Sequence, residues 1–165
     1  MVQNIVLIGM PGAGKSTVGV VLAKALKRPF LDTDLVIQTR EDRFLQEIID
    51  TEGMEAFLDI EANAIRALRV DGHVIATGGS VVYRKEAMNH LQAHGTLVYL
   101  AVPDEDIAER LSNIATRGVA KRLDQSLQEL FAERQPLYAQ YADIMLDARG
   151  LTPEEIVTCL VERMW

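Results

Sequence analysis

The sequence predicts an α/β fold, in which helices cover a parallel sheet, and three observations lead to this expectation. Apolar runs typical of buried strands alternate along the chain with longer segments in which apolar residues recur at helical spacing. The chain has 165 residues, which is enough to bury one sizeable core. No repeat and no linker rich in proline, glycine or serine interrupts it, so we expect a single domain over residues 1–165.

The positions of the expected strands and helices follow from these patterns. An apolar pair before Asp32 indicates one short strand, and longer strand-like runs cover 4–8, 73–77, 96–102 and, more weakly, 144–146. Helical spacing, with a break near Gly53, covers 15–27, 44–69, 84–93, 104–113, 124–141 and 153–163. Because ligands bind beyond the carboxyl ends of the strands in such sheets, the loops after the strands should share one crevice.

The loop after the first strand carries the phosphate-binding pattern G-x-x-x-x-G-K-[ST], from Gly9 to Thr17. In such a loop the backbone N–H groups surround phosphate oxygens, Lys15 reaches the β- and γ-phosphates, and the Ser16 hydroxyl ligates Mg²⁺. A strand precedes the loop and a helix follows it, which is the context that this motif needs to bind phosphate. The alternative, a glycine-rich turn without a ligand, does not require this context. We therefore expect a nucleoside triphosphate with Mg²⁺, bound by Gly12, Ala13, Gly14, Lys15, Ser16 and Thr17.

Two carboxylates follow the short second strand. Asp32 and Asp34 alternate along what we expect to be an extended segment, so both side chains should project toward the opening of the phosphate loop. One would then serve Mg²⁺ or its waters, and the other a substrate hydroxyl. The alternative is that Asp34 only caps a helix that begins at Leu35.

The strand at 73–77 is followed by Gly78, Gly79 and Ser80. Glycines at a strand end let the backbone approach a ligand, so this loop should border the same pocket, although a tight turn without function has the same composition. On the helix before it, Glu61 falls on the apolar stripe. This residue either contacts a ligand or is a solvated charge on the helix flank, and the second interpretation is at least as strong.

Basic residues in the second half of the chain provide two further candidates. The segment 110–122 holds four basic residues around Gly118, and it could act as a lid that places the Arg117 guanidinium on the transferring phosphoryl group. A solvated connecting loop is the alternative. Farther on, Pro136 should kink or restart a helix and thereby orient Arg134 toward a substrate carboxylate, whereas a surface ion pair is the simpler explanation.

The composition excludes several classes of partner. Seventeen basic and 24 acidic residues give a net charge of −7, which argues against general nucleic-acid binding and for a soluble protein. The apolar runs are too short to span a bilayer, and the phosphate loop begins too early to follow a signal peptide. The one cysteine, Cys159, cannot form an internal disulfide, which fits a reducing compartment. We expect a cytoplasmic monomer without a membrane or nucleic-acid partner.

In this order and at this spacing, the motifs resemble those of the shikimate kinase family of small P-loop kinases. The resemblance covers nearly the whole chain and rests on the phosphate loop 9–17, the acidic pair at 32–34, the segment 74–79, Arg117 and the segment 134–138. It implies a P-loop NTPase fold with a five-stranded parallel sheet in the order 2-3-1-4-5. It also implies substrate-binding helices at about 34–68 and a mobile lid at about 112–124.

The same resemblance implies an activity and a role for each site residue. The expected reaction transfers the γ-phosphoryl group of Mg-ATP to shikimate, for aromatic amino-acid biosynthesis. In these terms the donor half holds Ser16 and Asp32 for Mg²⁺, Lys15 and the lid residue Arg117 for the phosphates, and Arg110 and Pro153 on two sides of the adenine. The acceptor half holds Asp34 for the reacting hydroxyl, Arg134 for the carboxylate, and Gly78, Gly79 and Ser80 along the pocket.

The chain departs from the family in three places, and these departures affect the expected acceptor. The family patterns are G-E-x-x-F-R-x-x-E in the substrate helix, a triple glycine after the strand, and R-P-L-L in the lid. Leu58 replaces an arginine expected to bind the substrate carboxylate, which would forfeit about 2–5 kcal/mol of recognition. Another basic residue would have to take its place, and the candidates are Arg66, Arg84 and Lys85. Ser80 replaces the third glycine, and the lid reads Arg-Gly-Val-Ala over 117–120.

Three functions are therefore consistent with the sequence. The first is a shikimate kinase-like enzyme that phosphorylates a small hydroxylated metabolite, with shikimate as the leading acceptor. The second is a related kinase for a sugar acid or another polyol, which shares the donor half. The third is a nucleotide-binding module without catalysis, although a module of this kind has no need for the acceptor residues Asp34 and Arg134.

Overall fold

The computed structural model describes residues 3–112 and 124–165 and contains one five-stranded sheet. Its strands are β1 (Asn4–Ile8), β2 (Phe30–Asp32), β3 (Val74–Ala76), β4 (Gly95–Ala101) and β5 (Ile144–Asp147). They are all parallel and lie in the order β2-β3-β1-β4-β5. Both the α/β class and the strand order implied by the family resemblance are therefore confirmed.

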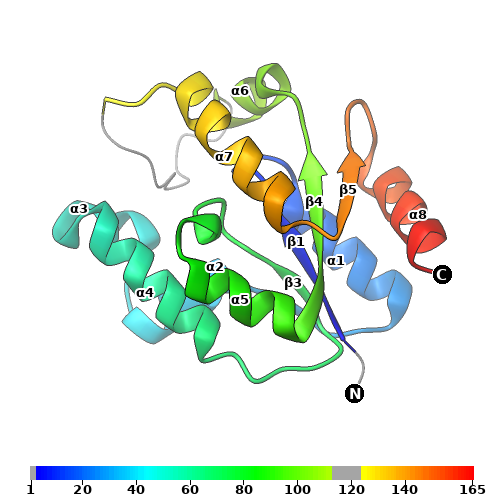
Figure 1. The fold of residues 1–165 in the computed structure, drawn as a ribbon, viewed down its shortest axis with the longest axis horizontal. Coiled ribbons are helices and arrows are strands. Elements are labelled where there is room, and N and C mark those ends of the chain that lie inside the picture. The colour runs from blue at the N-terminus through cyan, green and yellow to red at the C-terminus, as the bar shows by residue number, and fades with distance from the viewer. Residues whose placement is uncertain (1–2, 113–123) are drawn as a thin grey trace.

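Helices cover both faces of this sheet (Figure 1). Helices α1 and α8 pack against each other on one face, while α5 and α7 contact β4 on the other. Helices α2 to α4 form a group beside the β2 edge (Figure 1). The bounds are α1 (Lys15–Leu26), α2 (Thr33–Glu41), α3 (Leu45–Glu52), α4 (Met54–Arg66), α5 (Lys85–His94), α6 (Asp104–Ser112), α7 (Leu127–Tyr141) and α8 (Pro153–Met164), with a short 3₁₀ helix η1 at Val81–Tyr83.

The local sequence explains where several helices begin and end. Gly53 separates α3 from α4 as expected, because its φ of 87° lies outside the helical region. Helix α7 begins after Ser126, whose side chain forms a capping box with Glu129. It then continues through Pro136 to Tyr141, so the expected restart at Pro136 is wrong.

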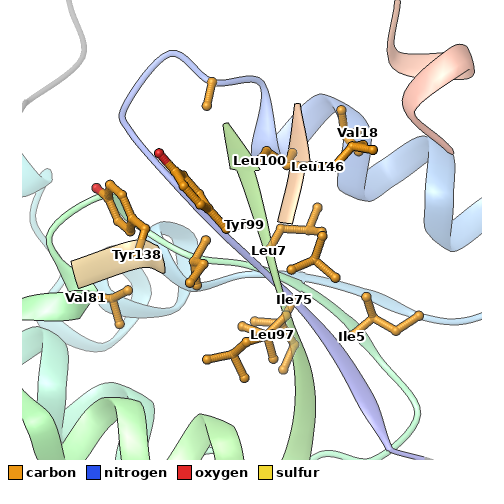
Figure 2. Close-up of a cluster of buried hydrophobic side chains, with 14 of the residues drawn as sticks. Ile5, Leu7, Val18, Ile75, Val81, Leu97, Tyr99, Leu100, Tyr138 and Leu146 are labelled. Atoms are coloured by element: carbon orange, nitrogen blue, oxygen red, sulfur yellow. The ribbon is translucent and has the colours of Figure 1, made fainter. Parts of the chain in front are cut away.

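The main core lies between the sheet and its helices. Figure 2 shows Val18 of α1 near Leu146 of β5, Ile75 of β3 beside Leu97 of β4, and Tyr138 of α7 beside Tyr99 of β4, all within one cluster of buried apolar side chains. The two tyrosine rings are 5.2 Å apart between centroids. A second apolar cluster joins α2, α3 and α4 and contains Ile37, Ile48, Phe57, Leu58 and Ala64. Helices α2, α3 and α4 thus have a small core of their own.

No helix in the described part of the chain is long and apolar enough to cross a membrane.

Candidate active site

One cavity of about 310 Å³ lies beyond the carboxyl ends of β1, β2 and β3. The topology brings the loops that follow these three strands to the same edge of the sheet, as the sequence predicts. Segments far apart in the chain therefore share the cavity. The residues that line it are Pro11, Gly12, Gly14, Lys15, Ser16, Asp32, Asp34, Leu35, Gln38, Phe44, Leu45, Gln46, Phe57, Thr77, Gly78, Gly79, Ser80 and Arg134.

The phosphate loop forms the donor side of this cavity. Gly12 and Gly14 have φ angles of 80° and 90°, a left-handed conformation that side chains disfavour, and Gly14 directly precedes α1. The helix N-terminus thereby points its N–H groups at the loop, which favours an anion. The buried Lys15 ammonium donates hydrogen bonds to the carbonyl oxygens of Gly9 at 2.8 Å and Met10 at 2.7 Å, so its charge is held inside the loop.

Asp32 joins the phosphate loop to the start of α2. Its Oδ2 accepts a hydrogen bond from the Ser16 hydroxyl at 2.7 Å, and its Oδ1 accepts one from the backbone N–H of Asp34 at 2.9 Å. Helix α2 therefore begins at Thr33 with Asp32 as its cap. The expectation that Asp32 and Asp34 alternate on one extended segment is wrong, and so is the alternative that Asp34 caps a helix at Leu35.

Ser16 and Asp32 form an oxygen pair that fits Mg²⁺. Mg²⁺ is a hard cation that proteins commonly hold through one or two side-chain oxygens, while phosphates and waters complete the octahedron. The two side chains already hydrogen-bond to each other beside the phosphate loop. No cluster of three or more His, Cys, Asp or Glu residues suited to a metal occurs in residues 3–112 and 124–165.

Asp34 faces the acceptor side of the cavity from the first turn of α2. Its Oδ1 lies 2.9 Å from the position that a Cβ atom on Gly78 would occupy, and Oε2 of Glu61 lies 2.8 Å from the same position. A side chain at residue 78 would therefore force both carboxyl groups to shift. Asp34 and Glu61 thus approach each other over the glycine, beside a surface that a ligand can reach.

Glu61 is buried behind the glycine loop that lines the cavity, which the sequence alone did not favour. It is only 2% exposed, so the interpretation as a solvated helix-flank charge is wrong. Ser80 Oγ donates a 2.8 Å hydrogen bond to its Oε1, while Oε2 has no hydrogen-bond partner among the described residues. Burial raises the pKa of Glu61 to about 8. Its place on the apolar stripe of α4 was the signal for this burial.

Arg134 enters the cavity from α7 and is fully buried. Its Nε donates a 3.0 Å hydrogen bond to the Tyr83 hydroxyl, and its guanidinium carbon lies 5.0 Å from the centroid of the Tyr83 ring. An exposed ion pair is therefore the wrong interpretation. Nothing in the sequence pattern marked Tyr83, because its contact with Arg134 joins η1 to α7 across 51 positions.

The structure places Leu58 outside the cavity lining. It is 3% exposed and belongs to the second apolar cluster of α2, α3 and α4. None of the three candidate replacements lines the cavity either. Arg84 instead donates hydrogen bonds to Glu55 at 2.7 Å and to Asp59 at 2.9 Å on α4. Among the described residues that line the cavity, only Lys15 and Arg134 are cationic.

Several predicted nucleotide contacts lie beside the cavity or beyond the described residues. Arg110 donates to the Gly12 carbonyl at 3.1 Å, which places it at the phosphate loop. Ala13 is buried, Thr17 is exposed on α1, and Pro153 opens α8, and none of these lines the cavity. Arg117 and most of the expected lid, 112–124, lie outside the described residues.

Comparisons with known proteins identify the family. The shikimate kinase family model matches residues 11–165. This chain belongs to the shikimate kinase family. It is 36% identical to shikimate kinase 2 of Enterobacter sp. (strain 638), with 98% of this chain and 95% of the relative covered. It is 38% identical to the shikimate kinase of Pseudomonas syringae pv. syringae, with 98% and 96% covered.

A solved shikimate kinase structure has the same fold over nearly the whole chain. It is the Acinetobacter baumannii enzyme in complex with shikimate, which has a TM-score of 0.90 at 28% identity and covers 99% of this chain and 93% of its own. As a shikimate kinase family member, the chain is an ATP-dependent kinase.

Proposed function

We propose that this protein transfers the γ-phosphoryl group of Mg-ATP to a hydroxyl of shikimate. The observation that carries the proposal is the single cavity in which Lys15 and the Ser16–Asp32 pair lie opposite Asp34 and Arg134. A phosphate-binding half and a half suited to a small hydroxylated carboxylate thereby line the same cavity. The family relationship supports shikimate as this acceptor. The product is shikimate 3-phosphate, an intermediate of aromatic amino-acid biosynthesis, made by a cytoplasmic monomer.

In this reaction the acceptor oxygen forms a bond to the γ-phosphorus while the bond to the β–γ bridging oxygen breaks, and ADP leaves. Asp34 orients the acceptor hydroxyl and takes its proton. Lys15 offsets charge on the phosphates, and Arg134 binds the acceptor carboxylate through a planar pair of N–H groups. Ser16 and Asp32 hold Mg²⁺, which neutralises phosphate charge when bound. Glycines 78 and 79 and Ser80 shape the acceptor pocket.

Further donor contacts complete the proposal. Arg117, outside the described residues, offsets charge on the transferring phosphoryl group. Arg110 and Pro153 flank the adenine, and the position of Arg110 at the Gly12 carbonyl supports its place beside the nucleotide. Gly12 to Thr17 hold the phosphates through their backbone N–H groups.

One observation favours a polyol without a carboxylate as a second acceptor, although it does not favour a sugar acid, whose carboxylate needs the same contact as that of shikimate. Leu58 is packed in the apolar cluster and no other described arginine or lysine lines the acceptor side, so carboxylate binding depends on Arg134 alone. A loss of one buried arginine–carboxylate pair weakens binding by about a hundredfold or more. An acceptor with fewer charged contacts and more hydroxyls would lose less.

A coupled assay of ADP release tests both candidates. Shikimate, gluconate, other hydroxy acids and polyols are supplied one at a time with Mg-ATP, and Lys15→Ala serves as the inactive control. We expect the highest kcat/KM with shikimate. Turnover of another compound without any response to shikimate would establish the second candidate, and tight ATP binding without transfer to any compound would show a nucleotide-binding module.

A further inference from the structure

The inference concerns how the Arg134 guanidinium is held at the acceptor side. Arg134 is fully buried in α7, and its Nη1 lies 3.0 Å from the position that a Cβ atom on Gly79 would occupy. One end of the guanidinium therefore lies against the glycine loop that lines the cavity. The other end, Nε, donates to the Tyr83 hydroxyl at 3.0 Å. The guanidinium thus lies between Tyr83 of η1, which accepts its hydrogen bond, and the glycine loop before it.

Tyr83 holds this guanidinium by two interactions of different kinds. Its hydroxyl accepts the Nε hydrogen bond, and its ring lies under the guanidinium carbon at 5.0 Å. A cation over an aromatic face is attracted to the ring, and more strongly when the pair is shielded from water. A long arginine side chain has many rotamers, so two contacts that fix its plane reduce the entropy lost when a ligand binds.

The direction of the Tyr83 hydroxyl is itself fixed by Glu133. The hydroxyl donates to Glu133 Oε1 at 2.6 Å, while Gln125 Nε2 donates to Glu133 Oε2 at 2.8 Å. A phenol has one proton to donate. Because a carboxylate accepts that proton, the phenol oxygen presents its lone pairs to Arg134. Arg134 therefore donates to Tyr83 and Tyr83 to Glu133, which also accepts from Gln125, so that the hydrogen bonds converge on the Glu133 carboxylate.

The glycine loop beneath the guanidinium is anchored in the same way. The Tyr138 hydroxyl, which is buried on the same helix as Arg134, donates to the Gly79 carbonyl at 2.5 Å. Helix α7 therefore fixes both Arg134 and the backbone against which its Nη1 lies. Since Arg134 is the one cation on the acceptor side of the described cavity, the orientation of this single group decides how a carboxylate is received.

We propose that Tyr83 is a positioning residue for acceptor binding, which holds the Arg134 guanidinium in the plane that receives the acceptor carboxylate. This inference rests on the proposed function, because it assumes that Arg134 binds the acceptor. Tyr83 does not touch the acceptor itself, and it acts only through Arg134. Its loss should therefore affect acceptor affinity while nucleotide binding and the rate at saturation are retained.

The test compares Tyr83→Phe with wild type. This variant keeps the ring under the guanidinium and removes only the hydroxyl. We expect the KM for shikimate to rise about ten- to a hundredfold, the range for a lost hydrogen bond to a charged group, while the KM for Mg-ATP and kcat change less than about twofold. Tyr141→Phe, at the end of the same helix, is the matched control and should leave all three parameters unchanged.

A second readout does not depend on the acceptor. In protein labelled with ¹⁵N at arginine, the buried Nε–H of Arg134 exchanges slowly with water, and Arg134→Lys assigns its resonance by removing it. We expect this exchange to be at least about tenfold faster in Tyr83→Phe than in wild type or Tyr141→Phe, since the proton loses its acceptor. Retention of the wild-type melting temperature in Tyr83→Phe would separate positioning from a general loss of structure.

The two readouts separate the failure of this inference from the failure of the proposed function. Unchanged exchange in Tyr83→Phe overturns the inference, whatever the enzyme phosphorylates, and so does an unchanged KM for an acceptor that wild type turns over. If wild type ignores shikimate but uses another acceptor, faster exchange together with a raised KM for that acceptor supports the inference and rejects shikimate. Faster exchange with equal increases in both KM values would show a structural role and contradict it.

Discussion

The donor and acceptor halves of the cavity are built in different ways. The donor half comes mostly from one contiguous segment, 9–17, whose backbone and helix N-terminus hold phosphate whatever the rest of the chain does. The acceptor half is assembled from side chains of α2, α4, α7 and the loop before η1. Binding through backbone N–H groups tolerates many side-chain substitutions, whereas a site made of side chains is altered by each substitution in it. The departure at Ser80 lies in this second half, whereas the departure at Leu58 lies in the apolar cluster outside the cavity lining.

The largest expected effect concerns the donor half. Lys15→Ala removes the one cation that lines the donor half of the cavity among the described residues. We expect kcat to fall about a thousandfold, as when a preorganised donor to a developing charge is lost. Lys24→Ala, an exposed position in the last turn of the same helix, should leave kcat unchanged. Steady-state ADP release measures both. Substantial activity in Lys15→Ala would contradict the assignment of the donor half.

The next effect tests whether Leu58 is core and not part of the acceptor site. Leu58→Ala should lower the free energy of unfolding by about 2–4 kcal/mol, because it leaves a cavity in the second apolar cluster. The KM for the acceptor should change less than about twofold, since Leu58 does not line the cavity. Denaturant unfolding and steady-state kinetics provide the two numbers. A large rise in KM with unchanged stability would place Leu58 in the acceptor site.

A smaller effect concerns the buried acid of the acceptor half. Because the folded-state pKa of Glu61 is raised to about 8 from its ordinary value of 4.5, the folded protein holds this proton where the unfolded chain has released it. The resulting stabilisation is complete below about pH 4.5 and is lost as the pH rises toward and through 8. Between these limits the loss amounts to about 4 kcal/mol, with a steepest slope of about 1.4 kcal/mol per pH unit.

Glu61→Gln is neutral at every pH and should remove this dependence. Its unfolding free energy should therefore change less between pH 5 and 8.5 than that of wild type, as measured by urea unfolding at several pH values. Glu162→Gln, an exposed position on α8, is the matched control and should keep the wild-type profile. An unaltered profile in Glu61→Gln would show that this carboxyl is ionised throughout.

The smallest effect concerns the hydroxyl that departs from the family pattern. Ser80→Ala removes the hydroxyl that donates to Glu61 Oε1, and we expect a loss of about 1–2 kcal/mol in the free energy of unfolding at pH 7. Because the Ser80 hydrogen bond lowers the pKa of Glu61, that pKa should also rise in the variant. Unfolding experiments and the titration of ¹³C-labelled glutamate follow the two changes. Unaltered stability and titration together would show that the Ser80 hydroxyl does not act on Glu61.

The sequence predicts the donor half well because its signals are local. The glycines, Lys15 and Ser16 lie in one motif, and alternation of strands and helices places that motif at the sheet edge. The acceptor half was less predictable because its contacts are tertiary. The hydrogen bond from Ser80 to Glu61 joins separate elements, and the burial of Glu61 depends on how α4 packs against the loop that holds Ser80.

The start of α2 shows a further limit of local reasoning. The same acidic pair is compatible with an extended segment that has two site carboxylates or with a capped helix, and the structure has the capped helix, in which Asp32 accepts from the Asp34 N–H. Asp32 ends the strand, caps the helix and accepts from Ser16 at the same time. Asp34 consequently lies in the first helical turn, and it still faces the cavity with Asp32.

A competition experiment tests the central claim most directly, namely that an intact donor half serves an acceptor half still suited to shikimate. Wild-type protein is given Mg-ATP with shikimate, gluconate and a panel of other hydroxy acids and polyols in one equimolar mixture, and the phosphorylated products are quantified by mass spectrometry. We predict that shikimate 3-phosphate is the main product and that it is absent with Lys15→Ala. Phosphorylation of another member of the mixture, with shikimate left unmodified, would contradict the claim.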